Sequence, residues 1–62
     1  MKLKFQVLRH GETIFDMTVE ESNLHELPNL TGAILHRFQK YHPQISLLDE
    51  YVILKWSKDP SG

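Results

Sequence analysis

Histidines are the first candidates for chemistry in this chain, because a cluster of imidazole rings could hold a metal ion. The sequence contains four of them, His10, His25, His36 and His42, and no cysteine that could serve as a thiolate ligand. None of them shows the short paired spacing or the four-residue helical spacing of a zinc site. His36 and His42 would lie about 240° apart around a helix. The spacing therefore predicts solvated surface histidines, with no metal and no cofactor.

A second candidate is the string Arg9-His10-Gly11-Glu12-Thr13, which follows an apolar run. It resembles the opening motif of the histidine phosphatase and phosphoglycerate mutase family. The resemblance implies that Arg9 binds phosphate and that His10 becomes transiently phosphorylated. Residues 27–32 are loosely similar to a later Pro-Leu-Thr segment of that family.

The residues around this string favour a turn. Residues 15–19 continue as a strand shortly after it, whereas the family's parallel α/β sheet needs helical crossovers. The family also uses a second histidine and a second arginine, in segments that would lie well beyond residue 62. A nucleophilic histidine without a phosphate clamp or a general acid has little catalytic leverage. We therefore expect no enzyme activity, and a degenerate relative of the histidine phosphatases is the third hypothesis.

The first twenty residues predict a β-hairpin with one apolar face. Two alternating apolar sets carry this prediction: Leu3, Phe5 and Val7, then Phe15, Met17 and Val19. A two-residue loop would put these sets on opposite faces, so we expect a three-residue loop over residues 9–11, with Gly11 in the left-handed position. A loop over residues 10–12 also keeps the faces aligned but places the glycine elsewhere. The expected pairs are Leu3 with Met17, Phe5 with Phe15 and Lys4 with Asp16.

One long helix is predicted after the hairpin. Asn23 and Glu26 have capping-box spacing and could start a single helical turn, and Pro28 suits the first position of the main helix. Pro43 ends that helix near residue 41 or 42. The apolar stripe expected to face the sheet contains Leu30, Ile34, Phe38 and Tyr41. Gly32 weakens the helix and could mark close packing.

Residues 51–56 form the strongest strand pattern, apolar on both faces as in an interior or doubly covered strand. Residues 45–48 are ambiguous between a short edge strand and a helical turn. A right-handed crossover would place the last strand beside the first and parallel to it. The fold class is therefore α+β, a ββαβ two-layer sandwich that resembles the β-grasp fold in topology alone. The chain lacks the paired glycines of β-grasp carriers, so we expect no carrier role.

Length and charge narrow the class of protein. A chain of 62 residues makes one domain, expected over residues 1–57 with a disordered tail at 58–62. Such a small domain buries about 60% of its unfolded surface, which favours a homodimer or a permanent partner. The formal net charge is −1, so the global basic footprint of a nucleic-acid binder is missing. Neither a secretion signal nor a membrane span is apparent, and we expect a cytoplasmic protein without a membrane partner.

Two surfaces are candidates for binding. In the expected register an apolar patch points away from the helix, formed by Leu8, Ile14, Tyr51 and Ile53. This patch, or the exposed edge of the last strand, predicts a small binding or regulatory protein that meets another protein or a second copy of itself. The alternative is a nucleic-acid-binding accessory protein. It would use the lysines of the outer sheet face (Lys2, Lys4 and Lys55, with Tyr51 for stacking) or the basic helix face at Arg37 and Lys40.

Overall fold

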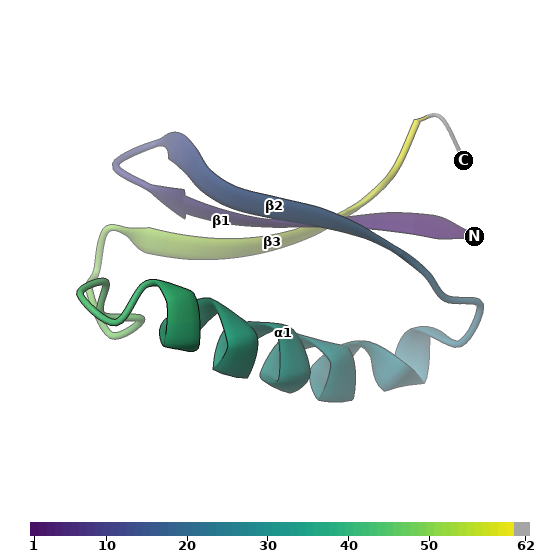
Figure 1. The fold of residues 1–62 in the computed structure, drawn as a ribbon. Coiled ribbons are helices and arrows are strands. Elements are labelled where there is room, and N and C mark those ends of the chain that lie inside the picture. The colour runs from purple at the N-terminus through teal and green to yellow at the C-terminus, as the bar shows by residue number, and fades with distance from the viewer. Residues whose placement is uncertain (61–62) are drawn as a thin grey trace.

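The computed structural model describes residues 1–60 and has two layers, a sheet and one long helix that lies against one face of it (Figure 1). The elements in chain order are β1 (Lys2–Arg9), β2 (Glu12–Glu20), the short 3₁₀ helix η1 (Leu24–Glu26), α1 (Leu27–Tyr41) and β3 (Val52–Lys58). The predicted α+β class and the ββαβ order are confirmed. Within residues 1–60, no helix is long and apolar enough to cross a membrane.

The sheet has the strand order β2-β1-β3, and β1 pairs antiparallel with both neighbours. The last strand therefore lies beside the first as predicted, but the expected parallel pairing is wrong. The 15-residue helix rises about 22 Å, close to the length of a strand of seven residues. The chain thus crosses the sheet once along α1 and re-enters at the hairpin end, so that β3 runs against β1 (Figure 1).

A β-bulge sets the register of the hairpin and corrects the predicted loop. Leu3 lies opposite Val19, Phe5 opposite Met17 and Val7 opposite Phe15, and the register shifts between Val7 and Leu8. The loop is the two-residue turn His10-Gly11, in which both residues have positive φ, 53° and 79°, as type I′ turns require. The extra residue of the bulge restores the alternation that a two-residue loop would otherwise invert. Lys4 lies opposite Thr18, yet its Nζ is 3.8 Å from Oδ2 of Asp16.

The core lies between the central strand and the helix. Its buried members are Leu3, Phe5, Val7, Ile34 and Phe38. The rings of Phe15 and Phe38 meet edge to face with centroids 5.4 Å apart. The predicted stripe is wrong at its last member, because Tyr41 is 71% exposed. The ring of His42, although exposed, contacts Phe38 at this end of the helix, with centroids 4.9 Å apart.

Local signals set both ends of the helical segment. The side chain of Asn23 accepts a hydrogen bond from the amide of His25, which caps η1 as predicted. Proline lies in the first turn of α1, where its missing N–H leaves no orphan donor. The expectation of close packing at Gly32 is wrong, because a Cβ built there would meet nothing within 4 Å.

One hydrogen bond joins the helix to the last strand. The indole Nε1 of Trp56 donates to Oγ1 of Thr31 at 2.8 Å, and the Thr31 hydroxyl donates to the carbonyl of Leu27 at 2.7 Å. The rings of Trp56 and Phe5 also lie 4.9 Å apart between centroids. Trp56 thereby fixes β3 over the helix.

The segment between α1 and β3 is a series of turns. Residues 45–48 form neither a strand nor a helical turn, although Ile45 and Leu47 pack against the core. The predicted tail begins too early, because Lys58 ends β3 and the amide of Asp59 donates to the carbonyl of Lys2. The rest of that prediction, at residues 61 and 62, lies outside the described residues.

Candidate functional site

The phosphatase-like string lies at the hairpin turn. Arg9 ends β1, His10 and Gly11 form the turn, and Glu12 begins β2. The guanidinium Nε of Arg9 lies 3.9 Å from Oδ2 of Asp49, and the ring of His10 stacks on Tyr51. Residues of this string therefore connect the hairpin turn to the residues just before β3.

An apolar and aromatic cluster covers the hairpin end of the sheet face opposite the helix. The register places Leu8 opposite Ile53 on this face, and the next pair toward the turn is His10 with Tyr51. The rings of His10 and Tyr51 stack with centroids 4.5 Å apart. Tyr51 is 53% exposed and Ile53 is 58% exposed. We call Leu8, His10, Tyr51 and Ile53 the outer patch.

The patch predicted from the sequence differs from the outer patch by one exchange: it contained Ile14, whereas the outer patch contains His10. Ile14 was expected on the outer face, but it is the extra residue of the bulge and packs against the core cluster. In a bulge two neighbouring residues oppose one residue of the partner strand, so the alternation of faces fails there. His10 belongs to the outer patch because its ring stacks on that of Tyr51.

Asp49 positions the start of β3. Its Oδ1 accepts a hydrogen bond from the amide of Tyr51 at 2.9 Å, and its carbonyl accepts one from the amide of Val52 at 3.1 Å. Its other carboxylate oxygen faces Arg9. One side chain thereby connects the end of β1 to the turn that presents Tyr51.

β3 is an edge strand, and Ile53 on its outer face is 58% exposed, so the expectation of an interior or doubly covered strand is wrong. Two backbone hydrogen bonds fix the direction of its peptide groups: the amide of His10 donates to the carbonyl of Tyr51, and the amide of Asp59 donates to the carbonyl of Lys2. In an antiparallel ladder such bonded pairs alternate along the strand. The odd-numbered residues of β3 therefore direct their N–H and C=O groups to β1. The even-numbered residues Leu54, Trp56 and Lys58 direct theirs to the open edge.

The open edge of β3 is flanked by apolar side chains. Ile53 lies on the outer face, and Leu54, on the helix side, is still 42% exposed. The outward amide of Val52 is already bonded to Asp49. The open stretch therefore begins at the carbonyl of Val52 and continues through Leu54 and Trp56.

The other open edge of the sheet, on β2, differs from the β3 edge in its charge and in its regularity. The amide of Glu21 donates to the carbonyl of Met1, and the same alternation turns the peptide groups of Asp16, Thr18 and Glu20 outward. Two of these three residues are acidic, and the strand carries the bulge. Charges and bulges are common means of protecting an edge from further pairing.

The basic residues of the nucleic-acid hypothesis are spread over the molecule. Lys2 and Lys4 lie on β1 opposite Glu20 and Thr18, and Lys4 pairs with Asp16 at 3.8 Å. Lys55 lies opposite Gln6 on the same outer face. Acidic side chains thus lie beside Lys2 and Lys4.

The basic helix face is separate from the lysines of the sheet. Arg37 borders a groove of about 190 Å³ between α1 and β2, whose other lining residues are Met17, Val19, Leu30, Ala33 and Ile34. Lys40 lies in the last turn of α1. The structure therefore does not bring the two basic sets together into one surface.

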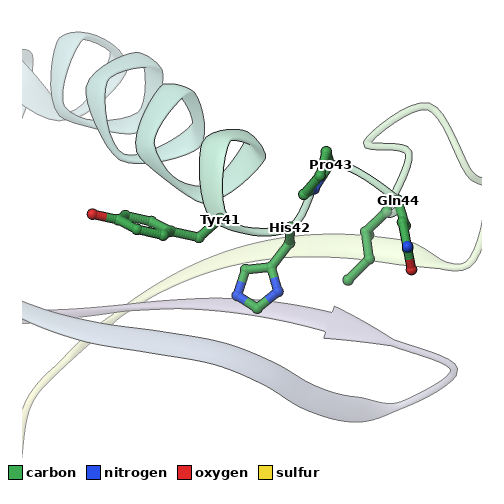
Figure 2. Close-up of a pocket in the computed structure, with 5 residues that line it drawn as sticks. Tyr41, His42, Pro43 and Gln44 are labelled. Atoms are coloured by element: carbon green, nitrogen blue, oxygen red, sulfur yellow. The ribbon is translucent and has the colours of Figure 1, made fainter.

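A shallow hollow of about 280 Å³ lies where α1 ends, lined by residues 41–45 (Figure 2). In Figure 2 the side chains of Tyr41 and His42 point in different directions, and the His42 ring points toward the sheet. That ring is already packed on Phe38. In the described part of the chain, no group of three or more histidine, aspartate or glutamate side chains is placed to hold a metal ion.

Comparisons with known proteins add no relative: no family model, curated protein or solved structure matches the chain. Sequence reasoning missed His10, Asp49 and Leu54 as members of the site. The Asp49-Glu50-Tyr51 turn sequence was the available signal for Asp49, since aspartate often bonds to the backbone amide two residues on.

Proposed function

We propose that this chain is a small binding or regulatory protein, and not an enzyme, that recognises an extended segment of polypeptide along the open edge of β3. The bound segment adds a strand beside β3, and the outer patch supplies side-chain contacts on one face. The observation that carries this proposal is the row of outward peptide groups at Leu54 and Trp56 beside the exposed side chain of Ile53.

Strand addition suits this edge for a physical reason. Backbone hydrogen bonds provide affinity in this mode of recognition, and alternate side chains provide specificity. On the outer face a bound strand would lie beside Tyr51 and Ile53, and on the helix side it would lie beside Leu54. The acidic and bulged β2 edge is a poorer template for the same pairing.

Two tyrosines permit a matched cross-linking test. Tyr51 belongs to the outer patch and is 53% exposed, whereas Tyr41, at the end of α1, is 71% exposed. A photoreactive phenylalanine analogue replaces one or the other, and the full chain is irradiated both in native extract and as pure protein. We expect polypeptide adducts from position 51, with the attachment mapped by mass spectrometry, and none from position 41.

A second variant ties the adducts to the strand edge. Leu54→Pro removes an outward N–H at a position where an edge strand tolerates proline, so the adduct from position 51 should be lost. Equal adducts from positions 41 and 51, or adducts that survive Leu54→Pro in a folded chain, would overturn the proposal.

A further inference from the structure

We propose that the segment bound by the β3 edge is β3 of a second copy of this chain, paired antiparallel about a two-fold axis at Leu54. This inference rests on the proposed function and names its partner. The two three-stranded sheets would join into one continuous sheet with both helices on the same face. The same surface of each copy forms such an interface, as is usual in symmetric dimers.

The charge pattern of β3 and of the turn before it is complementary to the same segment of a second copy that runs antiparallel. Acidic Glu50 directly precedes β3, and basic residues, Lys55 and Lys58, occupy its second half. The carboxylate of Asp49 is already engaged with Arg9 of its own chain. An antiparallel copy brings the acidic start of one strand against the basic end of the other. A parallel copy would align like charges, which destabilises neighbouring strands.

The direction of the peptide groups restricts the register. Because even-numbered residues face the open edge, they must lie opposite even-numbered residues of the second copy. With Leu54 opposite itself, Val52 lies opposite Trp56 of the second copy. Glu50, in the turn just before β3, then lies near Lys58 of the second copy. The amides of Leu54 and Trp56 then donate to the carbonyls of Leu54 and Val52 across the axis.

The neighbouring registers are less favourable. A shift in one direction places Lys55 directly opposite Lys55 of the second copy, so that like charges repel. A shift in the other direction places Glu50 opposite Trp56 and removes its pairing with Lys58. The register centred on Leu54 pairs apolar residues along the strand and also brings Glu50 near Lys58 of the second copy.

Two copies would also meet with little overall repulsion, since the formal net charge of each is −1. Leu54 of each copy, 42% exposed in the single chain, would be covered by its counterpart. A chain this short gains from such burial, because a domain of its size buries only about 60% of its unfolded surface when it folds alone.

The absence of cysteine from the sequence permits a direct test of the register. Leu54→Cys would place two sulfur-bearing residues directly opposite each other, with Cα atoms about 5.5 Å apart, within the range of a disulfide. Lys55→Cys would place the two Cα atoms beyond about 7 Å, too far for a bridge. We expect a covalent dimer from Leu54→Cys under mild oxidation and none from Lys55→Cys. The reverse result would overturn the register and the proposal.

Sedimentation equilibrium on the cysteine-free chain provides an independent test. Glu50→Lys or Lys58→Glu alone should weaken the dimer about tenfold, because each removes two symmetric ion pairs. The double exchange, Glu50→Lys with Lys58→Glu, should restore most of the affinity. Glu12→Lys and Lys40→Glu change the net charge equally at sites away from β3 and should leave the dimer unchanged.

Failure of this inference is distinguishable from failure of the proposed function. A chain that stays monomeric at millimolar concentration overturns the self-pairing. If position 51 of that monomer still cross-links to another polypeptide in a manner that depends on Leu54, the proposed function stands with a different partner. If position 51 gives no adduct either, both are overturned.

Discussion

The imidazole ring of His10 stacks on the phenol ring of Tyr51, with centroids 4.5 Å apart and planes inclined by 24°. The amide of His10 also donates to the carbonyl of Tyr51 at 3.2 Å. Backbone and side chain therefore both connect the hairpin turn to the start of β3. This contact holds Tyr51 in the outer patch.

A double-mutant cycle with His10→Ala and Tyr51→Ala should give a coupling free energy of about 0.5 to 1 kcal/mol, as aromatic pairs do. Chemical denaturation of the wild type, both single variants and the double variant measures it. Effects of the two substitutions that add within about 0.3 kcal/mol would show that the stack contributes no stability.

The two described glycines should respond in opposite directions to alanine. Gly11 has φ +79°, so Gly11→Ala should lower the free energy of unfolding by about 1 to 2 kcal/mol. Gly32 lies in an exposed part of α1 with open space around it, and Gly32→Ala should raise that free energy by about 0.5 to 1 kcal/mol. Thermal unfolding followed by circular dichroism compares both with the wild type. A loss of stability in Gly32→Ala would contradict the open environment of that residue.

The hydrogen bond between Trp56 and Thr31 makes a prediction about the attachment of β3. Thr31→Val removes the acceptor and leaves the half-buried indole N–H unpaired, which should cost about 1 to 3 kcal/mol. Thr31→Ser keeps the hydroxyl and serves as the control, with a smaller loss. Denaturant unfolding by circular dichroism gives the values. A loss in Thr31→Val that is no larger than the loss in Thr31→Ser would show that this hydrogen bond contributes no stability.

Asp49 should act mainly through its bond to the backbone. Asp49→Asn keeps the acceptor for the amide of Tyr51 and loses only the exposed pairing with Arg9, so we expect a change below about 1 kcal/mol. Asp49→Ala loses the bond as well and should cost about 0.5 to 1.5 kcal/mol more. The same unfolding measurement decides between them. If Asn is as damaging as Ala, the ion pair with Arg9 and not the turn positions β3.

The architecture was accessible from the sequence because local signals agree there. Alternation marked Leu3, Phe5 and Val7 as one face, and all three are buried. The helix signals at Pro28 and Pro43 placed the ends of α1 to within a residue of those observed. These features depend on neighbours along the chain, which sequence patterns report directly.

The errors arose where geometry over longer range decides. The bulge at Ile14 of β2 allowed the two-residue turn that simple alternation excludes, and it moved Ile14 to the helix side of the sheet. The direction of β3 depends on the length of α1 relative to the sheet, which residue patterns do not state. The apolar composition of β3 was interpreted as burial within the fold, whereas the described fold leaves Ile53 and Leu54 partly exposed at an edge.

Amide hydrogen exchange followed residue by residue tests most directly whether the β3 edge pairs with a second copy. The amides of Leu54 and Trp56 should become more protected as the concentration of the pure protein rises, while those of Thr18 and Glu20 on the β2 edge continue to exchange fast. Rapid exchange at Leu54 at every concentration, or protection that appears on β2 instead, would contradict the pairing.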